Sequence, residues 1–145
     1  MELEEYMKTQ LSERYRCFIL CGGGLTGKTE LVMKAAKSVG GKYIDVLKQF
    51  SEEPPGKAID SMRPEQFFGQ FKLEEGKLIV FDNMDFLFAL WTENQQREFI
   101  RKLDMKSNGT SLVAVLHNYK LLEETGLMKN NSKGQKRIVN IAEFI

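Results

Sequence analysis

The sequence is poor in several features that mark particular classes of protein. Its 145 residues include two cysteines, three prolines and one histidine, and its net charge at pH 7 is only +1. A chain so close to neutrality has no overall field that would hold a nucleic-acid backbone, so its charge does not indicate direct DNA binding. No apolar run approaches the roughly 20 residues that span a bilayer, and the acidic N-terminal stretch lacks the apolar core of a secretory signal. We therefore expect a cytoplasmic protein without a membrane segment.

The scarcity of cysteine also argues against a disulfide-bonded domain. Cys17 and Cys21 lie on one predicted strand, and four residues of extended chain span about 13 Å, which is too far for a disulfide. Both are predicted to be buried thiols, as in a reducing compartment. What is present is an ordinary globular composition, with 42% apolar and 28% charged residues, at the length of one domain. We expect a single domain over residues 1–145.

Five short apolar runs predict the strands of this domain. The runs are rich in β-branched and aromatic residues and stop at turn residues or at a change of pattern. They cover residues 16–21, 42–46, 77–82, 111–117 and 137–141. Because helical patterns lie between most of them, we expect an α/β fold with a mostly parallel five-stranded sheet covered on both faces.

The predicted helices rest on apolar spacing and on residues that begin or end helices. An apolar stripe at Leu3, Met7, Leu11 and Tyr15 predicts an amphipathic helix within residues 1–15, which either packs on the sheet or docks on a partner. The others are a helix from Lys28 that stops at Gly40, a short helix opened by Pro64, a helix from a Thr92–Gln95 capping box to about Lys106, and a helical piece from Tyr119 to Leu127. Apart from the Pro64 helix, residues 47–76 are expected to be irregular.

The segment GGGLTGKT, residues 22–29, matches the pattern G-x-x-x-x-G-K-[ST] of a phosphate-binding loop, with a predicted strand before it and a helix after it. Glycines permit backbone angles and a close approach that a Cβ would forbid, so successive N–H groups can point at phosphates. Lys28 should reach the β- and γ-phosphates, and the Thr29 hydroxyl should ligate Mg²⁺. We therefore predict ATP, or another nucleoside triphosphate, and Mg²⁺ as ligands. The predicted nucleotide-binding residues are Gly22, Gly23, Gly24, Leu25, Thr26, Gly27, Lys28, Thr29 and Glu30.

Asp82 ends the apolar strand LIVFD and resembles the Walker B acid of P-loop ATPases, which holds Mg²⁺ through water at the carboxyl edge of the sheet. The alternative is a strand-end Asp that caps the next helix. In ATPases of this layout a glutamate that polarises the attacking water usually follows the acid, but here the position is Asn83. An amide cannot accept a proton, so hydrolysis should be slow unless Asp85 or a group from a neighbour takes the task. Asp85 can equally be a helix N-cap.

The segment SLVAVLHN, residues 111–118, resembles the sensor-1 strand of AAA+ ATPases, which ends in a polar residue near the γ-phosphate. Asn118 would fill that role, with His117 as the second candidate and a simple turn asparagine as the alternative. The predicted catalytic residues are Lys28, Asp82, Asn83 and Asn118. AAA+ proteins also carry an arginine finger in the following segment, for which Lys133, Lys136 and Arg137 are candidates unless Arg137 simply opens the last strand.

Together with the segment FDNMDFLF at residues 81–88, these motifs make the chain resemble the BrxF family of short P-loop proteins from BREX phage-defence systems. The resemblance implies a three-layer, AAA+-like P-loop sandwich without a C-terminal helical lid. It also implies action as a homo-oligomer, or in a complex with larger defence proteins that act on DNA.

Three functions compete at this point. The leading one is an ATPase whose site is completed by another copy or by a partner. The second is a nucleotide-sensing module that hardly hydrolyses its ligand. The third is a small-molecule or nucleotide kinase, although the lysine-rich stretch 127–137 has only one arginine where such kinases usually carry an arginine-rich lid. The apolar cluster at residues 86–91 is expected to belong to the core rather than to an interface.

Overall fold

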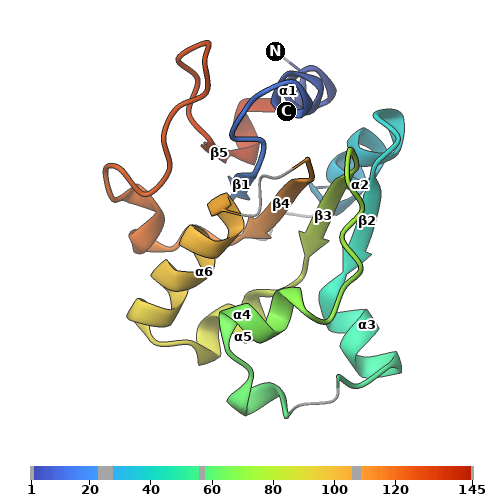
Figure 1. Ribbon diagram of the computed structural model, residues 1–145, viewed down its shortest axis with the longest axis vertical. Helices are drawn as coiled ribbons and strands as arrows, with labels where there is room; N and C mark the ends of the chain where they lie inside the picture. Colours follow the sequence, from blue (N-terminus) through green and yellow to red (C-terminus); the bar gives the residue numbers. More distant parts are fainter. Residues whose placement is uncertain (1, 23–27, 56–57, 106–108, 145) are drawn as a thin grey trace.

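A five-stranded parallel sheet organises the chain. The structure is a computed structural model that describes residues 2–22, 28–55, 58–105 and 109–144. Within these ranges the strands are β1 (Phe18–Cys21), β2 (Lys42–Asp45), β3 (Leu78–Asp82), β4 (Ser111–Leu116) and β5 (Ile138–Asn140). All pairings are parallel, in the order β2-β3-β4-β1-β5 (Figure 1). The predicted α/β class and all five predicted strands are confirmed, each strand lying within its predicted run.

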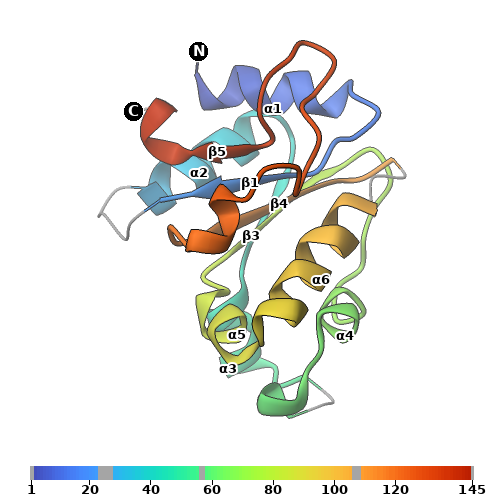
Figure 2. The same ribbon diagram turned by 90° about the vertical axis from the view of Figure 1, so that its left-hand side faces the viewer.

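Helices cover both faces of the sheet, as Figure 2 shows, which is compatible with a three-layer sandwich. Among the described residues the α-helices are α1 (Leu3–Leu11), α2 (Lys28–Ser38), α3 (Val46–Glu52), α4 (Pro64–Phe68), α5 (Asp85–Leu90) and α6 (Glu93–Met105). Single 3₁₀ turns are η1 (Ile59–Ser61), η2 (Lys120–Glu123) and η3 (Ile141–Phe144). No helix in the described ranges is both long and apolar enough to cross a membrane.

Several helix ends follow the local signals in the sequence. The Thr92 N–H donates to Gln95 Oε1 at 2.9 Å and the Gln95 N–H donates to Thr92 Oγ1 at 3.2 Å, so the predicted capping box opens α6. Pro64 is at the first turn of α4. Gly40, which follows α2, has a φ of +73°, a left-handed conformation that favours glycine.

Other boundaries differ from the predictions, each for a local reason. Residues 46–52 form α3 where irregular chain was expected, because the Asp45 carboxylate caps the Lys48 N–H at 3.1 Å. The first helix stops at Leu11, where the Ser12 hydroxyl bonds the Thr9 carbonyl. The piece predicted over 119–127 is only the turn η2. Gly126 has a φ of +85°, so no helix runs through it.

The two faces of the sheet pack against different kinds of side chain. On the side of α1 and α2, Phe18 and Leu20 join a mainly aliphatic cluster, whereas Cys17 and Ile19 of the same segment point to the opposite side. That second side holds a group of ring side chains from α4, β3, α5 and α6, in which Phe68 and Phe99 stack with centroids 5.3 Å apart. The strands are thus buried on both faces, as their continuous apolar runs predicted.

The predicted apolar cluster after β3 is core in part. Leu87, Phe88 and Trp91 are buried, whereas Leu90 keeps 53% of its surface exposed on the outer side of α5. The thiols also differ from each other: Cys17 is buried and Cys21 is half-buried. Two buried thiols were predicted, so that prediction holds fully for Cys17 alone.

Arg137 is buried at the amino end of β5 and is not placed to act as an arginine finger. Its side chain is fully buried and donates to the Cys17 carbonyl from Nε (3.0 Å) and Nη2 (2.7 Å). Nη2 also lies 2.6 Å from Asp104 Oδ1, and Nη1 donates to the Lys129 carbonyl at 3.2 Å. The guanidinium ties β1, α6 and the chain before β5 together. Lys133 and Lys136 remain exposed on this segment.

Candidate functional site

In the sequence, the predicted phosphate-binding loop follows β1, which ends at Cys21, and precedes α2, which begins at Lys28. Gly23, Gly24, Leu25, Thr26 and Gly27 lie outside the described residues, as does the side chain of Lys28. Gly22 is described, and its N–H donates to the Leu116 carbonyl at 3.1 Å, which extends the β1–β4 ladder by one bond. That amide is therefore committed to the sheet.

The alternation of side chains along β3 places Asp82 on the α2 side of the sheet. In β3, Val80 packs in the cluster beneath α2 and Phe81 packs on the opposite face, so the next residue returns to the α2 side. Asp82 is only 5% exposed. Among the described side chains it takes part in hydrogen bonds but in no ion pair, with its Oδ1 accepting from the Asn83 N–H at 2.8 Å.

Tyr43 joins the two residues that the sequence predicted as neighbours of a metal. Its hydroxyl donates to Asp82 Oδ2 from β2, whose register sets Tyr43 beside Val80. The Thr29 side chain, in the first turn of α2, lies close enough to the same hydroxyl to lower the pKa of Tyr43. Thr29 and Asp82, far apart in sequence, therefore both lie near one phenolic oxygen. Sequence reasoning missed Tyr43, although its place two residues before the end of the short strand β2 was a usable signal.

The pKa values of Asp82 and Tyr43 are both raised, and burial is the main cause for each. Burial raises the pKa of Asp82 above its usual range, and the negative charges of Asp45 and Asp85 add to this effect. The hydrogen bonds from Tyr43 and from the Asn83 N–H work in the opposite direction. Burial, followed by the hydrogen bond to Asp82, raises the pKa of Tyr43 above its usual range. A cation near Asp82 would relieve the cost of its burial.

The donor set around Tyr43 fits a magnesium ion held partly by its ligand and by water. Oxygen is the donor that Mg²⁺ prefers, and Mg²⁺ usually keeps several waters and takes one or two protein oxygens. Thr29 Oγ1 and the Asp82 carboxylate are oxygens of this kind, and both lie near the Tyr43 hydroxyl. Within the described ranges no group of three or more His, Cys, Asp or Glu side chains could hold a metal ion alone. The residues suit a metal that arrives with a phosphate ligand.

Asn83 is the only described residue other than glycine with a positive φ, at 56°. Asparagine tolerates this left-handed conformation better than most residues, and here it turns the chain sharply from β3 into α5. The residue type at this position therefore has a backbone explanation as well as the predicted functional one. A glutamate at this position would have to adopt a strained conformation, at about 1 kcal/mol.

Asp85 is the first residue of α5 and not its N-cap, which is Met84. Its carboxylate reaches across to the end of β4. Oδ1 accepts from the His117 N–H at 3.0 Å and from the Tyr119 hydroxyl at 2.8 Å, while Oδ2 lies 3.1 Å from His117 Nε2. A carboxylate with these donors is engaged, which weakens the alternative that Asp85 takes up the proton of an attacking water.

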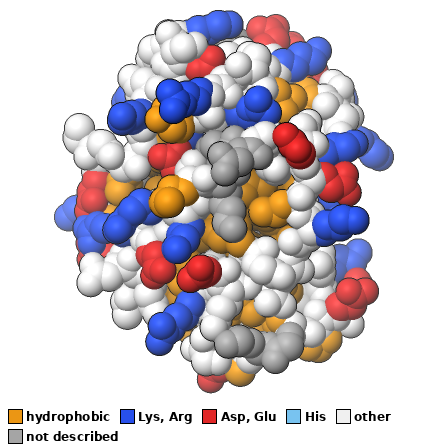
Figure 3. All heavy atoms as spheres, in the orientation of Figure 1, with side chains coloured by type: hydrophobic (Ala, Val, Ile, Leu, Met, Phe, Trp, Pro, Cys, Tyr) orange, Lys and Arg blue, Asp and Glu red, His pale blue; other side chains and the backbone are white. Residues whose placement is uncertain are grey.

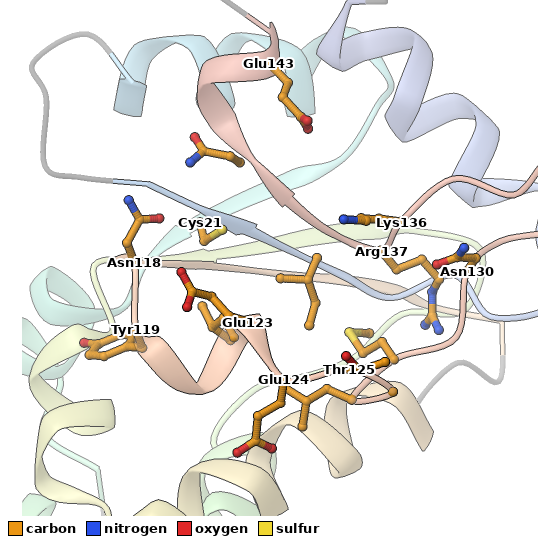
Figure 4. Close-up of a pocket in the computed structure, with 16 residues that line it drawn as sticks. Cys21, Asn118, Tyr119, Glu123, Glu124, Thr125, Asn130, Lys136, Arg137 and Glu143 are labelled. Atoms are coloured by element: carbon orange, nitrogen blue, oxygen red, sulfur yellow. The ribbon is translucent and has the colours of Figure 1, made fainter.

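Asn118 lies at the carboxyl end of β4, between the ends of β1 and β3 in the strand order. It is exposed and lines a pocket of about 640 Å³ that is lined by neither Thr29 nor Asp82. Figure 4 shows Asn118 and Cys21 at one end of this pocket and Asn130, Lys136 and Arg137 at the other. The structure thus brings Thr29 and Asp82 near each other at Tyr43, and Asn118 follows the neighbouring strand at the same edge of the sheet.

The surface gives no indication of a large field of one sign. On the face seen in Figure 3, Lys and Arg side chains are interspersed with Asp and Glu side chains. Glu30, the last predicted nucleotide-binding residue, is exposed on α2.

Comparisons of the chain with models of known protein families, with curated proteins and with solved structures found no match. The resemblance to the BrxF family therefore rests on the sequence motifs alone.

Proposed function

We propose that the chain binds a Mg²⁺-nucleoside triphosphate, with ATP as the first candidate, at the carboxyl edge of its sheet. The observation that carries the proposal is the convergence of Thr29 and Asp82 on the Tyr43 hydroxyl. Two separate sequence motifs mark these residues as the pair that would flank a nucleotide-bound metal. Carboxyl edges of parallel strands are also where open α/β sheets bind their ligands.

In this proposal each residue has one task. The loop 22–29 surrounds the phosphates, Lys28 supplies a positive charge to the β- and γ-phosphates, and Thr29 holds the metal directly. Asp82 holds the metal through water. Bound Mg²⁺ would neutralise charge on the phosphate oxygens. Asn118, beyond the end of β4, would orient the water that attacks the γ-phosphate.

The proposed ATPase is slow or depends on a partner. Asn83 occupies the usual base position and cannot accept a proton, and the Asp85 carboxylate is engaged with His117 and Tyr119. A base or an arginine from a second copy, or from a larger protein, would complete the site. The resemblance of residues 81–88 to the BrxF family supports a place in a DNA-directed phage-defence assembly.

Asn83 also favours a second candidate function. If nothing supplies the missing base, the chain is a nucleotide-sensing module that changes its assembly state when loaded. Phosphate release from Mg²⁺-ATP, measured over a wide range of protein concentration, separates the two functions. Specific activity that rises with concentration supports subunits that complete one another's sites, whereas activity equal to that of Lys28→Ala at every concentration supports the module.

Nucleotide binding itself is tested by titrating a fluorescent ATP analogue. Lys28→Ala should weaken binding by at least about tenfold, because a hydrogen bond to a charged group contributes about 1.5 to 3 kcal/mol. Lys34→Ala is a matched control, since Lys34 is an exposed lysine on the same helix. Equal affinity of Lys28→Ala and Lys34→Ala would refute the proposal.

A further inference from the structure

One carboxylate at the start of α5 holds both residues that flank Asn118. The donors to Asp85 are the His117 backbone N–H and the Tyr119 hydroxyl, and His117 Nε2 lies beside its second oxygen. These groups precede and follow Asn118 directly. The Asp85 side chain is 26% exposed, and its bond from the Tyr119 hydroxyl is partly buried, so this bond is stronger than a similar bond on an open surface. The contacts with His117 are exposed.

The same helix makes a second contact with this segment. The Tyr119 ring packs on Phe88 of α5, with ring centroids 4.5 Å apart. Phe88 is fully buried and lies one turn after Asp85, so both contacts come from one face of the helix. Burial and the hydrogen bond to Asp85 also raise the pKa of Tyr119 above its usual range, which keeps the donor protonated. Polar and apolar contacts therefore hold residues 117–119 in one place.

Helix α5 is in turn tied to the acid of β3. Only Asn83 and Met84 lie between Asp82 and the start of the helix, and Asn83 is fixed by its left-handed conformation and by its bond to Asp82. The Leu87 and Phe88 N–H groups donate to the Met84 carbonyl. A displacement of Asp82 would therefore move Asp85, because the chain between them is short and held by these hydrogen bonds.

We propose that Asp85 is a positioning residue that holds Asn118 in register with the nucleotide site and couples it to Asp82. This role rests on the proposed nucleotide binding and gives it a second part, since the polar group beyond β4 is set by the helix that follows β3. A misplacement of a reacting or orienting group by about 1 Å can cost about a hundredfold in rate, so such a residue affects turnover more than affinity.

The test follows two NMR signals while Mg²⁺ and a slowly hydrolysed ATP analogue are added. The Lys28 backbone amide reports nucleotide binding, and the Asn118 side-chain amide reports the position of the polar group. In the wild-type protein both signals should shift. In Asp85→Ala the Lys28 shift should persist and the Asn118 shift should be lost.

Two further variants separate positioning from simple loss of structure. Asp85→Asn keeps an acceptor oxygen for the His117 N–H and the Tyr119 hydroxyl, so it should retain the Asn118 shift. Asp60→Ala removes an exposed acid from η1 and should change neither signal. Where turnover is measurable, Asp85→Ala and Asn118→Ala should lower it by similar factors, and the double variant should lower it no further, because both act on one group.

The outcomes distinguish the two proposals. An Asn118 shift that survives in Asp85→Ala, or that is missing from a wild-type protein whose Lys28 signal moves, overturns the positioning role and leaves nucleotide binding intact. A wild-type protein in which neither signal moves overturns nucleotide binding, and the positioning role with it. Independent, multiplicative losses in the double variant also overturn the positioning role.

Discussion

A charged side chain is buried at each of the two edges of the sheet, but the two side chains have different partners. At the amino edge, the Arg137 guanidinium lies among two carbonyl groups and the Asp104 carboxylate, so its donors are well used. At the carboxyl edge, the partners described for Asp82 are the Tyr43 hydroxyl and the Asn83 N–H, both neutral. The first charge is neutralised within the fold, whereas no described side chain neutralises the second.

The difference is the one expected between a structural edge and the edge proposed to bind the nucleotide. A buried charge with an opposite charge and good hydrogen bonds has what it needs for stability. A buried acid with a raised pKa, and with no cation beside it among the described side chains, carries a cost, and such residues concentrate at functional sites. Arg137, a candidate finger from sequence, belongs to the first group. Removal of the two buried charges, Arg137 and Asp82, should therefore change stability in opposite directions.

The largest effect is expected at the amino edge. Arg137→Met should lower the free energy of unfolding by about 3 kcal/mol, because it removes a charged donor from Asp104 and from two carbonyl groups. Urea denaturation measures the loss, and Arg101→Met on the exposed side of α6 is the matched control. Affinity for the ATP analogue should stay unchanged in the folded variant. A loss below about 1 kcal/mol would show that this edge does not depend on the guanidinium.

A smaller loss is expected from Tyr43→Phe at the carboxyl edge. Removing a hydrogen bond to a charged group should cost about 1.5 kcal/mol in the absence of Mg²⁺. The loss should shrink when Mg²⁺-ATP is present, since the metal would then compensate Asp82. It should also shrink in an Asp82→Asn background, where the charge is gone. An equal loss in all three conditions would mean that the hydroxyl acts only by packing.

The smallest effect has the opposite sign. Asp82→Asn should raise the free energy of unfolding at pH 7 by about 1 kcal/mol without metal, because an amide costs less to bury than a carboxylate. The folded pKa of Asp82 is raised above the ordinary 3.8, so the folded state binds more protons and wild-type stability falls as pH rises from 3.8 through the folded pKa.

The Asp82→Asn advantage should therefore be small at pH 4 and reach a plateau once pH exceeds the folded pKa of Asp82. Urea denaturation of both proteins between pH 4 and pH 8 measures it. A constant difference over this range, or a less stable variant at pH 7, would contradict the contrast between the two edges.

Much of this fold was predictable because its strongest signals are local. Buried parallel strands are continuous apolar runs, so LIVFD and SLVAVL were found without knowledge of their partners. The α6 capping box and Pro64 likewise act within a few residues. Helix α3 was missed because its N-cap, Asp45, is also the last residue of a strand. The turn residues at 51–57 also made the preceding residues look irregular.

The site was predictable only where a motif fixes the spacing. Thr29 and Asp82 each belong to a short pattern, but their meeting depends on the sheet order, which no local pattern gives. Tyr43 and the bonds of Asp85 arise from that order, because β2 lies beside β3 and β4 lies on its other side. Arg137 was ambiguous for the same reason, since the burial of an arginine depends on three distant segments.

Trp91 provides a fluorescence probe of one face of the sheet. It is the single tryptophan of the chain, it is 5% exposed, and its indole N–H donates to the Met62 carbonyl at 2.7 Å among the rings beneath α4 and α6. Tryptophan emission will consequently report the aromatic layer and not the layer formed by α1 and α2. Emission and far-ultraviolet circular dichroism, recorded in the same denaturation, would show whether the two layers melt as one unit or in sequence.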